Sequence, residues 1–235
     1  MSFARFIFHL PLQLLTLCKE ALYPSYCVNC KRFGPLICQS CAGSIHFLSM
    51  PLKLELSPNY LDQVIACAKM DGPISKLIHA MKYQSVKAAA KVCAELLYMH
   101  TNLPLPDYIT AVPLHRQRRE VRGFNQAAEI AKNLSPLIKA PYHPFLRKQR
   151  FTTSQAKSRN RNERFQKLSD AFELIRSPAN SKPTSPNSTI PALTGKSILL
   201  IDDVCTTGTT LNLCAQKLKE AGAVQITALV IAHGK

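Results

Sequence analysis

The sequence predicts an α/β fold in which a parallel sheet is flanked by helices and a small cysteine-rich module precedes the sheet. Two apolar segments, 197–202 and 224–232, are typical of buried strands, and a helical pattern over 209–221 lies between them. Strand–helix–strand units of this length form parallel sheets with helices on both faces. The third observation is the cysteine cluster at 26–43, which is too short to bury a core of its own.

The other elements follow from hydrophobic periodicity and turn residues. Residues 1–25 predict an N-terminal amphipathic helix, because Pro11 and Gln13 interrupt an apolar run that is too short to span a bilayer. The main domain is expected over 60–235, with a flexible loop at 177–192. Within it we expect an arginine-rich loop after residue 114, strands at 60–70, 108–114 and 170–175, a turn at 71–73, and helices at 74–82, 86–100 and 125–135.

The chain is strongly basic, with 30 lysines and arginines against 14 aspartates and glutamates and a net charge of +16. This charge predicts an anionic partner but leaves polyphosphorylated sugars, nucleic acid and anionic lipid all open. The hydrophobic content of 46% is enough for a packed core and argues against global disorder. One tight cluster among nine cysteines favours a reduced, cytoplasmic location over an exported, disulfide-bonded protein.

An acidic pair followed by a threonine-rich loop marks the predicted ligand site. Asp202 and Asp203 end an apolar strand, and ligands of parallel sheets bind beyond the carboxyl ends of the strands. The two carboxylates could accept hydrogen bonds from a vicinal diol or hold Mg²⁺. A helix N-terminus that favours phosphate follows, with Gly208 and the hydroxyls of Thr206, Thr207, Thr209 and Thr210. This order fits a ribose 5-phosphate, and a polar turn with an ordinary helix cap is the alternative.

Two basic segments are candidates for the rest of the ligand site. Guanidinium groups after residue 114 could bind pyrophosphate oxygens bidentately, with contacts expected from His115, Arg116, Arg119 and Arg122. Lys82, at the end of a predicted helix, could approach the same pyrophosphate or simply cap its helix. Residues 147–167 could form a mobile cationic loop that closes over the ligand, with contacts from Lys148, Arg150, Gln155, Arg159 and Arg164. A solvated basic surface or a nucleic-acid-binding face is the alternative for both segments.

Four cysteines in two Cys-x2-Cys pairs predict a metal site formed by Cys27, Cys30, Cys38 and Cys41. Tetrahedral Zn²⁺ suits four thiolates and leaves no open coordination position, so the predicted role of the zinc is structural. Disulfides and an iron–sulfur cluster are the alternatives. Zinc binding would fold this short module, which has no core without the metal.

Residues 198–210 resemble the motif with which type I phosphoribosyltransferases bind 5-phosphoribosyl 1-pyrophosphate (PRPP). The resemblance implies that Asp202 and Asp203 bind the ribose hydroxyls and that residues 206–210 bind the 5′-phosphate. Purine-salvage members carry an aspartate at the position of Thr206, and a threonine cannot exchange a proton with a purine near neutral pH. This departure weakens a purine-salvage interpretation.

Further motifs resemble the ComF family and run in family order across most of the chain. They are Tyr26-Cys27-Val28-Asn29-Cys30 with Cys38-Gln39-Ser40-Cys41, Met81-Lys82-Tyr83, Val112-Pro113-Leu114-His115 with Arg122-Gly123-Phe124-Asn125-Gln126, and Thr153-Ser154-Gln155 with Arg164. The resemblance implies a cytosolic, zinc-bearing, phosphoribosyltransferase-like protein, associated in many bacteria with natural competence and the handling of incoming single-stranded DNA. Two departures are a single Cys67 where many members carry a second pair of Cys-x2-Cys units, and the insertion at 177–192.

The sequence therefore leaves three functions open. The first is a ComF-type protein that binds PRPP with Mg²⁺ and acts in competence with single-stranded DNA or a helicase partner. The second is a metabolic phosphoribosyltransferase that uses a small nucleophile. The third is a nucleic-acid-binding module with a degenerate PRPP site, motivated by the charge of +16.

Overall fold

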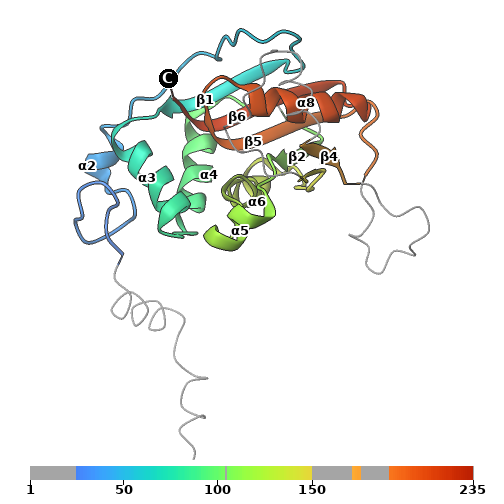
Figure 1. Cartoon of the computed structure of the whole chain (residues 1–235). Helices are drawn as coiled ribbons and strands as arrows, with labels where there is room; N and C mark the ends of the chain where they lie inside the picture. Colours follow the sequence, from blue (N-terminus) through green and yellow to red (C-terminus); the bar gives the residue numbers. More distant parts are fainter. Residues whose placement is uncertain (1–24, 104, 150–170, 176–190, 235) are drawn as a thin grey trace, which may run out of the picture.

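Figure 1 shows the computed structural model, which describes residues 25–103, 105–149, 171–175 and 191–234. The predicted amphipathic helix at 1–25 lies outside these residues, except for Ser25. Most of the basic segment 147–167 and of the loop 177–192 lies outside as well, including Arg150, Gln155, Arg159 and Arg164. Within the described residues, no helix is both long enough and apolar enough to cross a membrane.

A four-stranded sheet with the order β1-β6-β5-β2 forms the centre of the molecule. β5 and β6 lie in the middle and pair along their whole length, from Ser197 opposite Gln225 to Cys205 opposite His233. All neighbouring strands are parallel, so their carboxyl ends meet at one edge of the sheet. This confirms the predicted fold class, with strands β1 (Gln63–Lys69), β2 (Tyr108–Ala111), β5 (Ser197–Cys205) and β6 (Gln225–His233).

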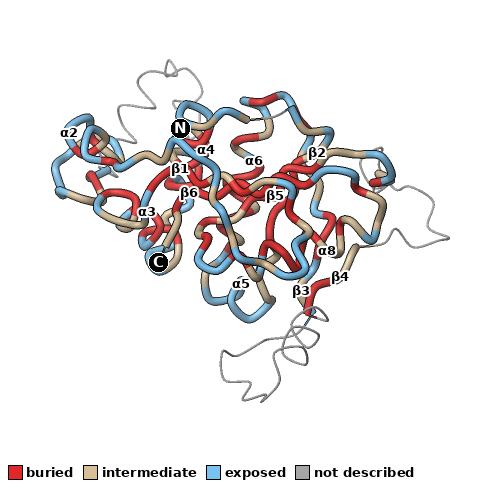
Figure 2. Tube along the Cα trace, turned by 90° about the horizontal axis from the view of Figure 1, so that it is seen from above, coloured by how far each residue is buried: buried red, intermediate tan, exposed pale blue. Residues whose placement is uncertain are grey.

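Alternate side chains of β5 face two different hydrophobic cores, as the twofold periodicity of a strand requires. Leu199 and Ile201 join the core beneath helices α3 (Gly72–Tyr83), α4 (Ala89–His100) and α6 (Gln126–Ile138). Ile198 and Leu200 join the opposite core, beneath α8 (Thr209–Glu220) and the antiparallel pair β3 (Leu146–Lys148) and β4 (Phe172–Leu174). Figure 2 shows buried residues running through the sheet between these two layers.

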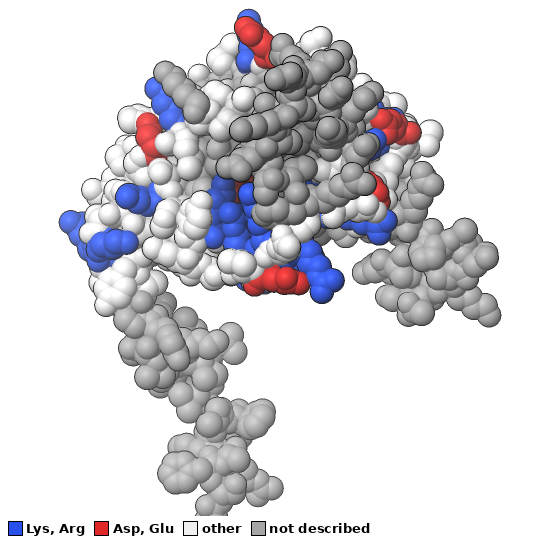
Figure 3. All heavy atoms as spheres, viewed as in Figure 1, with Lys and Arg blue, Asp and Glu red and all other residues white. Residues whose placement is uncertain are grey.

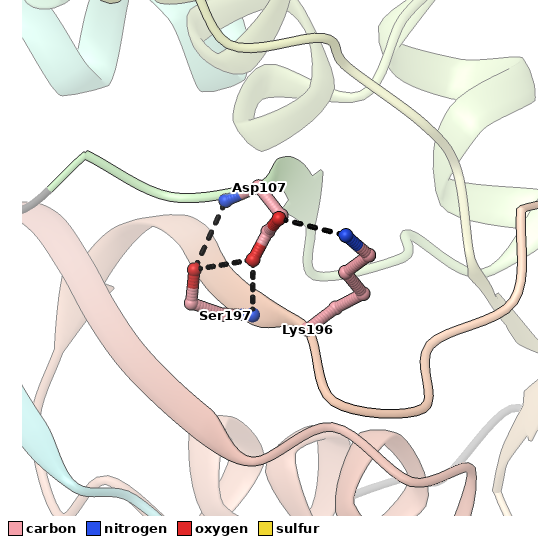
Figure 4. A network of polar contacts seen from close by, with 3 residues as sticks. All are labelled: Asp107, Lys196 and Ser197. Atoms are coloured by element: carbon pink, nitrogen blue, oxygen red, sulfur yellow. Dashed lines mark hydrogen bonds and ion pairs between the residues drawn. The ribbon is translucent and has the colours of Figure 1, made fainter.

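One carboxylate ties the starts of β2 and β5 together (Figure 4). Asp107 accepts hydrogen bonds from the backbone N–H and the hydroxyl of Ser197, both at 2.8 Å, and from the Lys196 ammonium at 3.0 Å. The Ser197 N–H, followed by the lysine ammonium, lowers the pKa of Asp107 to about 2. This network fixes the amino ends of two neighbouring strands, whose carboxyl ends carry the candidate site.

The expected arginine-rich loop is instead a helix, α5 (Arg116–Arg122). The prediction was wrong because it weighed like-charge repulsion and overlooked local helix signals. His115 caps the helix by accepting a hydrogen bond from the Gln117 N–H at 3.3 Å, and Arg116 pairs with Glu120 one turn on. Gly123, with a φ of 79°, ends the helix in the left-handed conformation.

The cysteine module packs on the α3–α4–α6 core rather than standing apart. Val28, Leu36 and Ile37 are partly buried against that core, and Ile45 is part of it. Phe47 forms a bridge to Ala68 of β1, which joins the module to the edge of the sheet. The module also contains the short helix α2 (Gln39–Ala42), which lies near α3 in Figure 1.

Candidate functional site

The acidic pair lies near the carboxyl end of β5. Because successive side chains of a strand alternate, the two carboxylates point to opposite faces of the sheet. Asp203 is buried and faces the α3–α4 layer, where its charge acts on Cys93 of α4. Asp202 faces the α8 layer, where its charge acts on Cys214 of α8. The Asp202 carboxylate also accepts a hydrogen bond from the Asp203 N–H at 2.8 Å. The pair therefore straddles the carboxyl edge of the sheet.

Both carboxylates open onto one cavity of about 200 Å³, here called the inner cavity. It lies where the carboxyl ends of β5 and β2 meet, and Val112, Pro113 and Leu114 after β2 form its apolar wall. Apart from Ala127, its other lining side chains are polar or charged: Lys82, Arg118, Arg122, Asn125, Gln126, Lys148, Asp202, Asp203 and Thr210. The sheet edge predicted for the site is thus the edge at which these groups converge.

Lys82 reaches the acidic pair from the last turn of α3. Its ammonium lies 2.9 Å from the Asp203 carboxylate, and both side chains are largely buried. Gln126 donates a hydrogen bond to the Met81 carbonyl at 3.4 Å and accepts one from Arg122 at 3.2 Å. The end of α3 is therefore held against the junction of α5 and α6, and the segments 81–83 and 122–126, far apart in sequence, meet at the inner cavity.

Because α5 is a helix, its arginines point in two directions. Arg118 and Arg122, four residues apart, line the inner cavity. Arg116 and Arg119 line a different, larger cavity, and His115 caps the helix without lining the inner cavity. Arg118, which was not among the residues named from the sequence, thus lines the inner cavity. A prediction of helix for this segment would have placed Arg118 and Arg122 on the same helix face, because they are four residues apart.

The threonine-rich segment forms the turn between β5 and α8. Gly208 has a φ of 75° and is the N-cap of α8, and a side chain there would collide with Leu54. The hydroxyls of Thr207 and Thr209 form a hydrogen bond with each other at 3.0 Å. Thr210, in the first turn of α8, lines the inner cavity, so a phosphate there would meet both a hydroxyl and the helix N-terminus.

The charges around the inner cavity favour an anionic ligand. Burial, with the neighbouring Asp203 carboxylate, raises the pKa of Asp202 to about 8. Burial and the nearby Arg118 charge lower the pKa of Lys148. Four cationic side chains thus face two carboxyl groups, of which Asp203 is paired with Lys82 and Asp202 has a raised pKa. Lysine and arginine also gather over α5 and α6 in Figure 3.

The sulfur atoms of Cys27, Cys30, Cys38 and Cys41 all lie within 4.8 Å of one another. Four sulfurs around a tetrahedral zinc are separated by about 3.8 Å, given Zn–S bonds of about 2.3 Å. The Cys30 and Cys38 sulfurs are 3.6 Å apart, and Asn29 donates a hydrogen bond to the Cys41 sulfur at 3.3 Å. A hydrogen bond from the Cys41 backbone lowers the pKa of Cys38. The donor set and its spacing fit one metal ion.

The family described as "Phosphoribosyl transferase domain" matches residues 120–235. Competence protein F of Haemophilus influenzae is 28% identical over 208 residues, which cover 86% of this chain and 81% of that protein. DNA utilization protein YhgH of Escherichia coli is 28% identical over 86% of each chain. Competence protein ComFC of Bacillus subtilis is 33% identical over 114 residues, covering 48% of this chain and 39% of that protein.

The chain is similar to ComF-type competence proteins over most of its length. The two relatives each match 86% of this chain, which is more than the 120–235 segment matched by the phosphoribosyl transferase domain. Several motifs quoted from the sequence meet in space, because the acidic pair, Lys82, Arg122, Asn125 and Gln126 all border the inner cavity. The cysteine motif forms its own cluster, and Thr153-Ser154-Gln155 with Arg164 lies outside the described residues.

Proposed function

We propose that this protein is a member of the ComF family, binds PRPP at the inner cavity and acts in the uptake or use of DNA. The observation that supports PRPP binding is the convergence of Asp202, Asp203, Thr210 and the cations around one cavity at the carboxyl edge of the sheet. The ribose hydroxyls would lie against the carboxylates, and the 5′-phosphate at the threonine turn and the start of α8.

The pyrophosphate would lie against the cationic side of the inner cavity. Arg118, Arg122, Lys82 and Lys148 surround that side, and guanidinium groups bind phosphate oxygens bidentately. Four cations at one cavity suit a ligand that carries several negative charges. A single phosphate would not need so many.

Mg²⁺ fits the same proposal, because carboxylate and phosphate oxygens are its preferred ligands. Asp202 and Asp203 are the described carboxylates at the inner cavity that could hold the ion directly or through water. When bound, the ion would neutralise charge on the pyrophosphate. The protein's own residues would position the ribose, and the ion pair between Lys82 and Asp203 lies next to it.

The role in DNA uptake or use rests on the relatives. Proteins named for competence and for DNA utilization match 86% of this chain. We extend that role to this chain and propose single-stranded DNA or a helicase-type protein as its partner. The charge of +16 supports an anionic partner.

Thermal melting with and without PRPP–Mg²⁺ tests the ligand. The melting temperature should rise with PRPP–Mg²⁺, and Asp202→Ala combined with Asp203→Ala should abolish the rise. The control combines Glu95→Ala with Glu120→Ala, which removes two exposed carboxylates of helices α4 and α5. An unchanged melting temperature in the unmutated protein would remove the proposal. Pyrophosphate release in a screen of bases and amines would separate a transferase from a protein that only binds PRPP.

We also propose that the four cysteines hold a structural zinc ion. Purified protein should contain one zinc per chain, and Cys27→Ser with Cys41→Ser should lose it. Cys67→Ala is the matched control, because Cys67 is buried in β1 outside the cluster. Iron in place of zinc, or full metal retention in the double variant, would contradict the assignment.

A further inference from the structure

A second cavity adjoins the inner cavity and is the larger of the two, with a volume of about 530 Å³; it is here called the outer cavity. The two cavities share Pro113, Leu114, Asn125 and Lys148, so they are continuous along this wall. The outer cavity lies between α5, α6 and β3, and the proposed PRPP site shares only its wall, including Lys148. Its volume is within the range of small-molecule sites.

The cations of the outer cavity fall into two groups. Arg116 is already paired with Glu120 at 2.8 Å, and Arg147 with Glu173 at 2.9 Å. Lys87 and Lys132 both pair with the buried Glu129, at 3.1 and 2.9 Å. In contrast, Arg119 and Lys148 form no ion pair with a carboxylate of the described residues.

Arg119 and Lys148 are therefore the cations of the outer cavity that could pair with an outside anion, and the Lys148 ammonium lies 5.0 Å from the centre of the Phe172 ring. Arg119 is exposed, and the pKa of Lys148 is lowered by burial and by the nearby Arg118 charge. A phosphate between Arg119 and Lys148 would offset the positive charge around Lys148 and could accept hydrogen bonds from both side chains.

The rest of the outer cavity offers a planar apolar surface beside polar groups. The half-buried ring of Tyr142 lies there with Pro144 and Leu146. Tyr142 is close enough to Glu129 for the carboxylate to add to the effect of burial in raising the tyrosine pKa. A nucleobase has matching chemistry, because its flat face is apolar and its edge carries hydrogen-bond donors and acceptors.

We propose that the outer cavity binds one nucleotide unit of a single-stranded nucleic acid, with its phosphate between Arg119 and Lys148 and its base against Tyr142. A strand fits better than a free nucleotide because the positive charge continues beyond the cavity. Arg116 lies beside Arg119, and Arg118 and Arg122 continue the charge into the inner cavity, so neighbouring phosphates would also meet cations. The inference deepens the proposed DNA role and does not require PRPP to bind.

Fluorescence anisotropy with a labelled oligothymidylate of about 15 nucleotides, titrated at several salt concentrations, tests the inference. Arg119→Ala should weaken binding roughly tenfold and lower the salt dependence by about one phosphate contact. The control is Lys91→Ala, which removes an equally exposed cation from α4, and it should change the affinity by less than about twofold. Both substitutions lie on helix surfaces, so the fold should survive them.

Two results would overturn the inference. The first is an equal loss of affinity in Arg119→Ala and Lys91→Ala, because binding would then follow net charge alone. The second is competition by thymidine monophosphate that is as strong as competition by the strand, because the cavity would then be a site for free nucleotides. Melting with PRPP–Mg²⁺ on the same unmutated protein keeps the two proposals separate, since strand binding without a PRPP shift removes only the proposed PRPP site.

Discussion

The ammonium group of Lys82 lies 2.9 Å from the carboxylate of Asp203, across the space between the end of α3 and the end of β5. The lysine is 21% exposed and the aspartate 12%, so the pair is shielded from most of the solvent. An ion pair in such a setting is costly to break, because the remaining charge has no partner and little water.

Lys82→Met removes this charge and keeps an unbranched side chain. We expect the free energy of unfolding to fall by about 1–3 kcal/mol, measured by urea denaturation at neutral pH. Lys91→Met, whose ammonium is exposed and 4.0 Å from Glu95, should cost less than about 0.5 kcal/mol. Adding Asp203→Asn to Lys82→Met should recover part of the loss, and strictly additive losses would contradict the pairing.

The raised pKa of Asp202 predicts a pH-dependent stability. An unfolded aspartate titrates near about 3.9, whereas burial and Asp203 raise the folded pKa to about 8. Between these values the folded protein holds a proton that the unfolded chain has lost, so stability falls as the pH rises through this window. Asp202→Asn removes the effect, and its melting temperature should exceed that of the unmutated protein by more at pH 8 than at pH 5. An equal difference at both pH values would contradict the assignment.

The two faces of α5 predict that its arginines differ in PRPP binding. Arg118→Ala should weaken PRPP–Mg²⁺ binding roughly tenfold in calorimetric titration, because Arg118 lines the inner cavity. Arg116→Ala should have a much smaller effect, since Arg116 lines the outer cavity and pairs with Glu120. Equal losses would mean that the binding depends on the net charge of α5 and not on the direction of each side chain.

Two glycines with nearly the same φ allow the cost of backbone strain to be distinguished from the cost of a steric collision. Gly208 has a φ of 75° and Gly195 a φ of 73°, but an added methyl group collides with Leu54 only at Gly208. Gly195→Ala should therefore cost about 1 kcal/mol from the left-handed backbone alone, and Gly208→Ala should cost distinctly more in chemical denaturation. It should also weaken PRPP binding, because Gly208 shapes the turn before Thr210. Similar costs at the two positions would show that Leu54 moves aside freely.

Removing the metal should destabilise the whole domain. Val28, Leu36 and Ile37 of the cysteine module pack against the α3–α4–α6 core, so unfolding the module exposes part of that core. Calorimetry after treatment with a chelator should show one transition at a lower temperature, by at least several degrees for each kcal/mol of stability lost. An unchanged main transition would mean that the module contributes nothing to the domain.

The sequence was informative wherever a pattern is local. The apolar run at 198–201, the helix from Thr209 and the spacing of the four cysteines each predicted an element that the structure contains. The prediction of a loop for the arginine segment was wrong because its residues combine high helix propensity with mutual repulsion. The cap at His115 and the Arg116–Glu120 pair favour the helix over the loop. No local pattern could show that Lys82 contacts Asp203, since the two lie far apart in sequence and their contact depends on how α3 packs.

Asp202 and Asp203 belong to different layers of the molecule, one beside α8 and the other beside α3 and α4. A sugar held by both carboxylates would act as a clasp between these layers, because separating the layers would then require breaking its hydrogen bonds. Bound ligand should therefore slow amide hydrogen exchange in helices on both sides of the sheet at once, including backbone that never touches the ligand.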